Sequence, residues 1–288
     1  MNASGSRFAS DWLALREAAD HAARSAALTE RASDWLAGAR ASAPLTLVDL
    51  GCGRASNPGY LSPRLPGPQR WRLVDHDPEL LEVARQRLAG GEDRPDIECR
   101  CIDLADAGAL ADVFDGVELV CASALFDLCS TPWIESLAAA CATRGLPALF
   151  TLSVDGDWQF SDASGPRQDA EDDWVRGLFS EHQRRDKGLG AALGGEAPAA
   201  LASAFEAHGY RVERAASPWQ LAPGSEAALT LGQALVAGWA AAAVEQYPDQ
   251  AARTEAWQLT RQRDLANGRC GVWVGHVDLL LTPPGSDA

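Results

Sequence analysis

Positive charge is scarce in this sequence. Its 288 residues hold 25 Lys and Arg against 40 Asp and Glu, so the formal net charge is −15. A protein that binds a nucleic-acid duplex needs clustered Lys and Arg, because these side chains displace the counterions of the phosphates. The composition therefore argues against nucleic acid as a partner.

Long apolar runs are also absent. No stretch reaches the roughly 18 apolar residues that a membrane-spanning helix needs; the Ala-rich segment 234–244 comes nearest and is interpreted as a packed helix. Residues 1–7 are small and polar, without the basic and then apolar order of a secretory signal. We therefore expect a cytoplasmic protein with no membrane partner.

Cysteine and histidine do not form metal-binding patterns. The seven cysteines include no Cys-x-x-Cys pair, and no His, Cys and Glu cluster has the spacing of metal ligands. Free, buried thiols in a reducing compartment are the simplest interpretation. We accordingly predict no metal site.

The sequence does contain a regular alternation of apolar strands and helices. Residues 10–36 have helical spacing, with a break expected near Thr29. Downstream, short apolar runs alternate with helical segments, which is typical of right-handed βαβ units in a parallel, doubly wound sheet. The expected strands are 45–50, 71–75, 97–103, 117–123 and 146–153, and the expected helices are 78–88 and 133–143.

The alternation ends near residue 154. Beyond it we expect helices at 172–183 and 199–208, a strand at 210–221, a helical segment at 226–265 and a last strand at 271–281. The predicted fold class is α/β, with a doubly wound, seven-stranded and mostly parallel sheet. Residues 1–44 form an N-terminal helical cover in this prediction. Residues 45–288 form one compact unit, whose insertions 155–198 and 226–265 lie over the carboxyl ends of the strands.

Acidic residues and glycines gather at the predicted strand ends. In an open parallel sheet, ligands bind beyond the carboxyl ends of the strands. Gly51 and Gly53 allow the backbone to pass close to a ligand, and Asp75, 24 residues after Gly51, is placed to accept from two ribose hydroxyls. Asp103, which ends the third strand, can accept from an exocyclic amine. These positions describe a pocket for an adenosine group.

The glycine loop does not suit a dinucleotide. A dinucleotide fingerprint has a third glycine where this chain has Ser56. Asp49 lies directly under the loop and disfavours a pyrophosphate. A cationic adenosine ligand without phosphate fits better.

Three ordered motifs carry a family resemblance. Val48-Asp-Leu-Gly-Cys-Gly-Arg54 resembles the first motif of class I S-adenosylmethionine-dependent methyltransferases. Leu73-Val-Asp-His-Asp-Pro-Glu-Leu-Leu81 and Cys101-Ile-Asp-Leu104 are similar to the second and third, and the resemblance extends from about Leu45 to Ser153. It implies S-adenosylmethionine as the cofactor and methyl transfer to a small-molecule acceptor, with specialised or cofactor metabolism as the expected setting.

The resemblance also implies roles for individual residues. The glycine loop would hold the methionine part of the cofactor, Asp75 the ribose, and the ends of the third and fourth strands the adenine and the sulfonium. The implied cofactor contacts are Asp49, Gly51, Gly53, Asp75, His76, Asp103, Leu104, Ser123 and Leu125. Glu118 departs from the family pattern at a position that is variable. The run from Arg54 to Pro58 is a second departure, and it leaves open how the cofactor carboxylate is held.

Arg16 is our candidate for that carboxylate. It lies on an N-terminal helix, and helices in this position commonly close over the cofactor in the family. The alternative is an exposed Arg16–Asp20 pair at i, i+4, which stabilises a helix only slightly.

A polar cluster at 180–190 is the candidate acceptor site. The imidazole of His182 is suited to serve as a general base for an acceptor hydroxyl near neutral pH, and Arg185 and Lys187 can bind an acidic substrate. Asp127 is a further substrate-binding candidate. The alternative is a solvated helix end that carries cations near its carboxyl terminus.

Other functions remain open on the sequence alone. The same pocket would serve cyclisation of the cofactor or transfer of its aminocarboxypropyl arm, and it would also serve a protein methyltransferase. A binding module without activity is disfavoured by the three intact acidic strand ends. Ser123-Ala-Leu-Phe-Asp127 differs from the Asn/Asp-Pro-Pro-aromatic run of enzymes that methylate base amines. The sequence does not fix the oligomeric state, for which a homodimer is one candidate.

Overall fold

The computed structural model describes residues 10–39, 44–89, 95–105, 107–186 and 188–285. Its centre is a sheet whose seven main strands have the order β3-β2-β1-β4-β5-β9-β7, in which β9 alone runs opposite to the other six. The predicted α/β fold is confirmed. The strands are β1 (Leu45–Leu50), β2 (Gln69–Asp75), β3 (Asp96–Cys101), β4 (Leu119–Ser123), β5 (Ala148–Asp162), β7 (Arg211–Ala216) and β9 (Gly271–Thr282).

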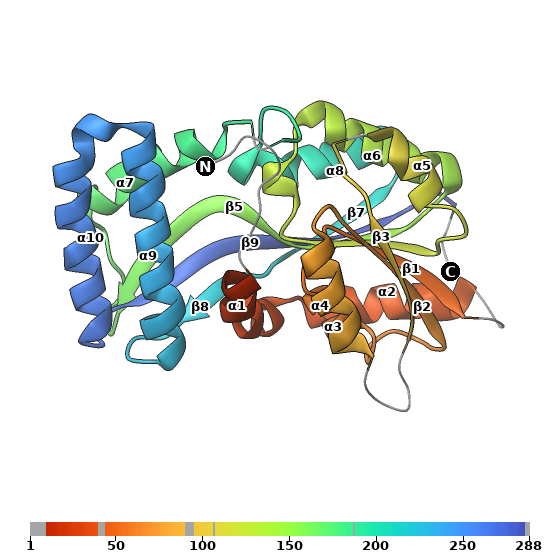
Figure 1. Ribbon diagram of the computed structural model, residues 1–288, viewed down its shortest axis with the longest axis horizontal. Coiled ribbons are helices and arrows are strands. Elements are labelled where there is room, and N and C mark those ends of the chain that lie inside the picture. The colour runs from red at the N-terminus through yellow and green to blue at the C-terminus, as the bar shows by residue number, and fades with distance from the viewer. Residues whose placement is uncertain (1–9, 40–43, 90–94, 106, 187, 286–288) are drawn as a thin grey trace.

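Helices cover both faces of this sheet (Figure 1). Side chains alternate along β1, so that Leu47 packs in one hydrophobic cluster and Val48 in the other. Both clusters are closed to solvent by helices on their outer side. One face carries α2 (Ala26–Ala39), α3 (Ser56–Leu61) and α4 (Pro78–Leu88), and the other carries α5 (Leu110–Val113), α6 (Thr131–Arg144) and α8 (Ala197–Ala207).

Capping side chains explain where two helices begin. Asp77 accepts from the backbone N–H of Glu79 at 2.9 Å, and Pro78 occupies the first turn of α4. The predicted bounds 45–50 and 78–88 are confirmed to the residue. The break predicted near Thr29 is wrong, because α1 (Ser10–Ala23) ends earlier. Ser25 Oγ accepts from the backbone N–H of Leu28 at 3.2 Å and thereby starts α2.

The fifth strand is longer than the sequence suggested. β5 has 15 residues and continues past two register shifts in its pairing with β9. The first shift contains Leu152, whose φ of 56° is rare for a branched side chain. The strand predicted at 210–221 is divided into β7 and β8 (Trp219–Leu221), which both pair with β9.

The outer parts of β5 and β9 carry a helical extension, which we define as α7 (Ala170–Gln183), α9 (Glu226–Gln246) and α10 (Ala251–Ala266) (Figure 1). Its core is aromatic. The rings of Trp158 on β5 and Trp239 on α9 are stacked with centroids 4.0 Å apart and planes 9° apart, and Trp257 packs beside them. The short β6 (Gly165–Pro166) pairs with the end of β5.

Helix α9 is long and apolar enough to cross a membrane by length and composition alone, with a mean hydropathy of 1.6 in its most apolar window. In the structure, 44% of that window is buried, and α9 packs against both other helices of the extension. A buried core helix can have the same length and composition, so one helix of this kind is weak evidence for a membrane span.

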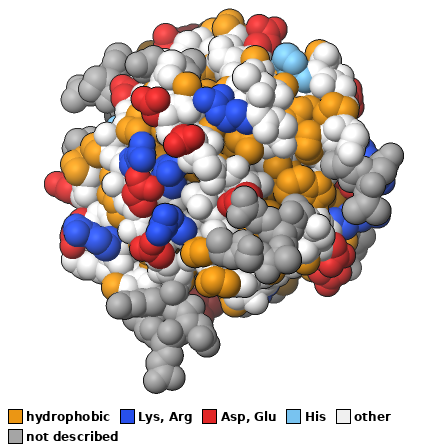
Figure 2. Space-filling view, turned by 90° about the vertical axis from the view of Figure 1, so that its right-hand side faces the viewer, with side chains coloured by type: hydrophobic (Ala, Val, Ile, Leu, Met, Phe, Trp, Pro, Cys, Tyr) orange, Lys and Arg blue, Asp and Glu red, His pale blue; other side chains and the backbone are white. Residues whose placement is uncertain are grey.

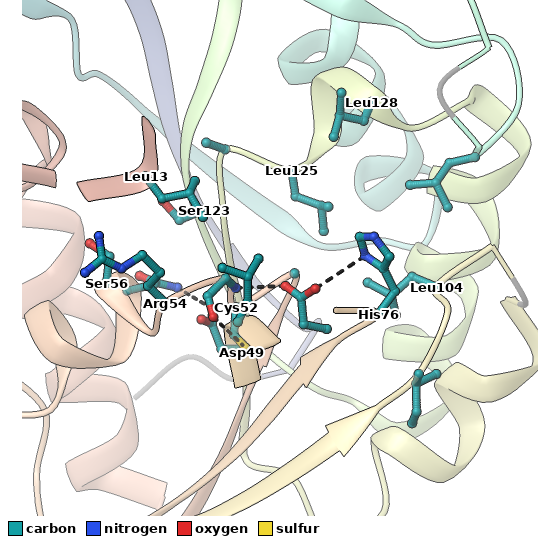
Figure 3. A pocket seen from close by; sticks show the side chains of 18 of the residues that line it. Leu13, Asp49, Cys52, Arg54, Ser56, His76, Leu104, Ser123, Leu125 and Leu128 are labelled. Atoms are coloured by element: carbon teal, nitrogen blue, oxygen red, sulfur yellow. Dashed lines mark hydrogen bonds and ion pairs between the residues drawn. The ribbon is translucent and has the colours of Figure 1, made fainter. Parts of the chain in front are cut away.

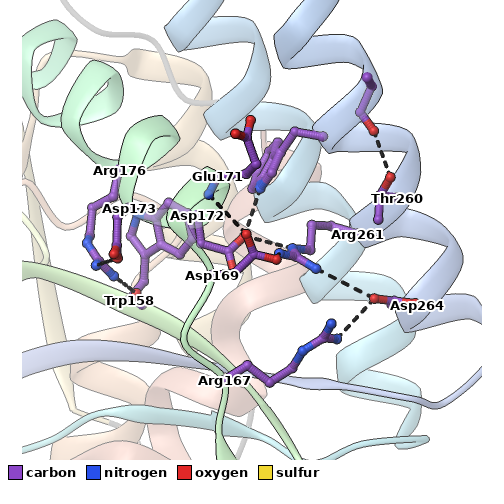
Figure 4. A network of polar contacts seen from close by, with 12 residues as sticks. Trp158, Arg167, Asp169, Glu171, Asp172, Asp173, Arg176, Thr260, Arg261 and Asp264 are labelled. Atoms are coloured by element: carbon purple, nitrogen blue, oxygen red, sulfur yellow. Dashed lines mark hydrogen bonds and ion pairs between the residues drawn. The ribbon is translucent and has the colours of Figure 1, made fainter.

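A buried ionic network joins α7 to α10 (Figure 4). The guanidinium of Arg261 is 3% exposed and donates from Nε to Asp172 Oδ1 at 2.7 Å and from Nη2 to Asp169. Trp257 Nε1 donates to the same oxygen of Asp172 at 2.7 Å. At the surface, Arg253 forms a second, exposed pair with Glu171 across the same two helices.

The β3 edge of the sheet is covered with charged pairs. Arg70 and Asp96 are 2.7 Å apart, and Glu98 pairs with Arg72 at 3.0 Å and with Arg100 at 2.6 Å. Figure 2 shows this end of the molecule, where acidic and basic side chains lie side by side. Charges of this kind discourage pairing with another strand.

Candidate functional site

A cavity opens at the carboxyl ends of β1 to β4, beneath α1 (Figure 3). Its empty volume is about 1240 Å³, including the part that is open to solvent. The structure brings all ten predicted cofactor contacts to its wall, although they come from α1 and from the carboxyl ends of four different strands and the loops that follow them. These residues are Arg16, Asp49, Gly51, Gly53, Asp75, His76, Asp103, Leu104, Ser123 and Leu125.

The glycine loop needs both of its glycines. Gly51 and Gly53 have φ angles of +62° and +51°, a region that favours glycine. A Cβ atom on Gly51 would lie 3.0 Å from Leu125 Cδ1, and one on Gly53 would lie 3.2 Å from Leu13 Cδ1. At these two positions the backbone therefore approaches the cavity without an intervening side chain.

Asp75 joins the end of β2 to this loop. Its Oδ2 accepts from the backbone N–H of Gly53 at 2.8 Å, and its Oδ1 accepts from that of Asp77 at 3.0 Å. His76 Nδ1 lies 3.3 Å from the same Oδ1. A carboxylate has about four acceptor sites, so Asp75 retains capacity for the hydroxyls of a ribose.

An apolar slot lies beside Asp75. Leu80, Ile102 and Leu104 line it, and Trp133 Nε1 fixes the end of the slot by donating to the backbone oxygen of Leu104 at 2.6 Å. The exposed carboxylate of Asp103 stands at its edge. A flat ring with an exocyclic amine suits this arrangement.

The floor of the cavity is a buried polar chain. Asp49 is 1% exposed, and burial raises its pKa to about 7. Its Oδ1 accepts from Asn57 Nδ2 at 2.5 Å, while its Oδ2 has no partner among the described residues. Asn57 Oδ1 accepts from Arg24 Nη1 at 2.5 Å, and Arg24 Nη2 donates to Ser123 Oγ at 3.1 Å.

Two arginines reach the cavity wall. Arg16 donates from Nε to Asp20 Oδ2 at 2.9 Å, and its guanidinium lies over the ring of Trp219. The predicted i, i+4 pair therefore exists, but it is largely buried instead of exposed. Arg54 donates from Nη1 to the backbone oxygen of Ser10 at 3.0 Å, and its buried Nε has no partner among the described residues.

The predicted acceptor residues lie elsewhere. His182 Nε2 on α7 is 3.4 Å from Glu245 Oε2 on α9, and Arg185 Nη1 donates to Glu245 Oε1 at 3.0 Å. Both residues therefore contact Glu245 between α7 and α9. Neither residue lines the cavity, nor does Asp127. Lys187 lies outside the described residues.

The helical cover of the cavity is only partly where it was expected. Helix α1 and the loop residues Gly188 and Leu189, which follow the first insertion's helix, line the cavity. Segment 226–265 supplies none of the described lining residues, because α9 and α10 pack on the outer part of β5 and β9.

Sequence reasoning missed several lining residues, among them Leu13, Asn57, Ala124, Leu128 and Leu189. The left-handed φ of 52° at Ala124 has no sequence signal, because alanine does not favour that region. The departure of the run from Arg54 to Pro58 from the family pattern was a usable signal for Arg54 and Asn57.

Comparison with solved structures supports the fold. A cyclopropane-fatty-acyl-phospholipid synthase-like protein from Lactobacillus casei matches with a TM-score of 0.52 at 13% identity, over 88% of this chain and 89% of that chain. The chain therefore has the fold of class I S-adenosylmethionine-dependent methyltransferases, with the strand order typical of them. At 13% identity this likeness extends to the fold alone.

Two further matches are weaker. A cyclopropane synthase from Mycobacterium tuberculosis gives a TM-score of 0.46 at 10% identity, over 88% of this chain and 83% of that chain. A phosphoethanolamine N-methyltransferase from Haemonchus contortus gives 0.44 at 10% identity, over 96% and 59%. Scores at this level add nothing to the assignment. No family model and no curated protein matches the sequence.

Proposed function

We propose that this chain is an S-adenosylmethionine-dependent methyltransferase that acts on a small-molecule acceptor in the cytoplasm. The observation that carries the proposal is the gathering of Asp49, Asp75, Asp103 and the glycine loop around one cavity. This cavity lies where the strand order reverses between β1 and β4, which is the position at which open α/β sheets bind ligands.

The residues present fit both charged groups on the amino-acid part of the cofactor. The unpartnered Asp49 Oδ2 and Arg54 Nε are a buried acceptor and a buried donor that belong to two residues lining the same cavity. They complement the ammonium and carboxylate groups of an amino acid. The left-handed glycines provide the space for the chain between them. Arg16 is a second cation on this wall.

The bound cofactor would supply an activated methyl group on a sulfonium that is its own leaving group. The protein then has to align donor and acceptor and keep water away. Leu125, Leu128 and Leu189 line the end of the cavity beyond Ser123, which favours an acceptor with an apolar body.

Ligand-induced stabilisation tests the proposal. S-Adenosylhomocysteine binds only the folded chain in this view, so about 100 times its Kd should raise the Tm by about 5 °C or more. Asp75→Ala should remove most of this rise, because two ribose hydroxyls lose their partner. Asp96→Ala, at the exposed Arg70 pair, is the control and should keep it. Stabilisation by nicotinamide dinucleotides and not by S-adenosylhomocysteine would overturn the assignment.

A further inference from the structure

The junction between α1 and α2 places a buried cation behind the cavity floor. Arg24 is 6% exposed, and its guanidinium lies over the ring of Tyr60, 4.8 Å from the centroid. The backbone beside it is held in place, because the N–H of Ser25 donates to Asp278 Oδ2 at 2.8 Å. A charge this deep in the protein is costly unless nearby groups compensate it.

Asn57 connects this cation to Asp49. Its amide oxygen accepts from Arg24 and its amide nitrogen donates to Asp49 Oδ1, so the two partners fix which way the amide points. The Asn57 amide thus links the guanidinium of Arg24 to the carboxylate of Asp49 in a chain of hydrogen bonds, in which each bond polarises the next. Arg24 Nη2 also holds Ser123 Oγ, so the same cation orders two lining residues.

Asp49 is left with one unused oxygen. Its Oδ1 is occupied by Asn57, whereas Oδ2 is buried, has no partner among the described residues, and belongs to a residue that lines the cavity. A buried anionic acceptor without a donor destabilises the protein until a donor arrives. A ligand ammonium group is a donor that also carries the compensating charge.

We propose that Arg24 and Asn57 are positioning residues, which hold Asp49 in place and direct its free oxygen toward the ammonium group of an amino-acid-bearing ligand. This inference rests on the proposed function. It makes the N-terminal helices part of the recognition of the amino-acid end of the cofactor, in addition to covering the cavity.

Other ionisable groups near this chain are few. The negative charges of Asp20 and Asp278 favour the charged form of Arg24, and the negative charge of Asp75 disfavours the ionised form of Asp49. The thiols of Cys52 and Cys121 also face Asp49, but burial raises the pKa of both well above its usual range, so they stay neutral near pH 7. Arg24 is therefore the cation that favours the ionised form of Asp49.

Two ligands isolate the amino-acid end. S-Adenosylhomocysteine carries an ammonium and a carboxylate, whereas 5′-methylthioadenosine has the same nucleoside and sulfur without the amino acid. Calorimetric titration of the full chain with both gives the ratio of their affinities. Arg24→Gln should weaken S-adenosylhomocysteine about tenfold or more and change 5′-methylthioadenosine less than about twofold.

Arg31→Gln is the matched control. Arg31 lies one turn into α2 and pairs with Glu213 at the surface, so its loss should leave both affinities unchanged. Asn57→Ala serves as a second variant if Arg24→Gln does not fold, and it should show the same selective loss. An equal loss for both ligands, or no loss for either, would overturn the positioning role.

The pH dependence supplies a readout that a packing defect does not move. In the unmodified chain, the preference for S-adenosylhomocysteine should increase as pH rises through about 7, where Asp49 ionises. In Arg24→Gln this increase should shift to higher pH, and an unshifted profile contradicts the proposal. If the unmodified chain binds neither ligand, the proposed function itself is wrong. If it binds both equally at every pH, only the present inference fails.

Discussion

Asp49 combines a functional position with an unfavourable environment. Burial raises its folded-state pKa to about 7 from an ordinary value of 3.8, so between these values the folded chain binds a proton that the unfolded chain has lost. Stability of the ligand-free protein is therefore greatest below about pH 4 as far as this group is concerned, and it falls as pH rises through 7. The difference corresponds to about 4 kcal/mol.

Replacing Asp49 by asparagine should separate stability from binding. The new amide oxygen can still accept from Asn57, and the substitution removes the buried charge, so Asp49→Asn should raise the Tm of the ligand-free protein at pH 8 by several degrees. Its affinity for S-adenosylhomocysteine should fall about tenfold or more. Thermal denaturation at pH 5 and pH 8, with and without ligand, measures both effects. If the Tm of Asp49→Asn at pH 8 is lower than that of the unmodified chain, ionised Asp49 does not destabilise the folded protein.

The sequence predicted the cavity residues that follow a strand directly. Gly51, Asp75 and Asp103 could be located because the ends of parallel strands meet at one edge of a sheet. Arg24 could not, because its hydrogen bond to Asn57 joins residues 33 positions apart through a helix junction that no periodicity reveals. His182 does not line the cavity, and nothing in the local sequence indicates its pairing with Glu245.

Helices α7 and α10 should depend strongly on Arg261. Arg261→Met leaves the buried carboxylate of Asp172 without its cation, and removal of one partner of a buried pair typically costs about 3–5 kcal/mol. The exposed Arg253, which joins the same two helices, gives the matched control, since Arg253→Met should change stability little. Urea denaturation of both variants provides the comparison. Equal stabilities of the two would show that the Arg261 network contributes no net stability.

Elements were predictable where one local signal acted alone. The apolar run of β1 and the Asp-Pro start of α4 set their bounds. The outer half of β5 has the local sequence of a loop, because Asp155 and Gly156 disfavour strands. It is extended nevertheless, since β9 pairs with it on the far side of two register shifts. Such long-range pairing overrides local propensity and leaves no trace in a single segment.

At the scale of the whole molecule, the central sheet and the helical extension share two strands. β5 and β9 run from the central sheet into the core of the extension, so displacement of one part strains the other. This continuity predicts a single cooperative unfolding transition. The extension also holds the only cluster of stacked indoles among the described aromatic contacts.

The stack of Trp158 and Trp239 gives the extension an optical signal of its own. Two parallel indoles at 4.0 Å couple electronically and should produce a near-ultraviolet circular dichroism band that Trp239→Phe abolishes. Trp219, beside Arg16 at the cavity, should change its fluorescence when S-adenosylhomocysteine binds. Trp219 lies on β8, and it and Trp158 both pair with Val274 of β9. Following the circular dichroism band together with the far-ultraviolet signal of the whole chain during denaturation therefore compares the extension with the rest of the fold. Coincident curves would establish one cooperative unit, and separate midpoints would show that the extension melts by itself.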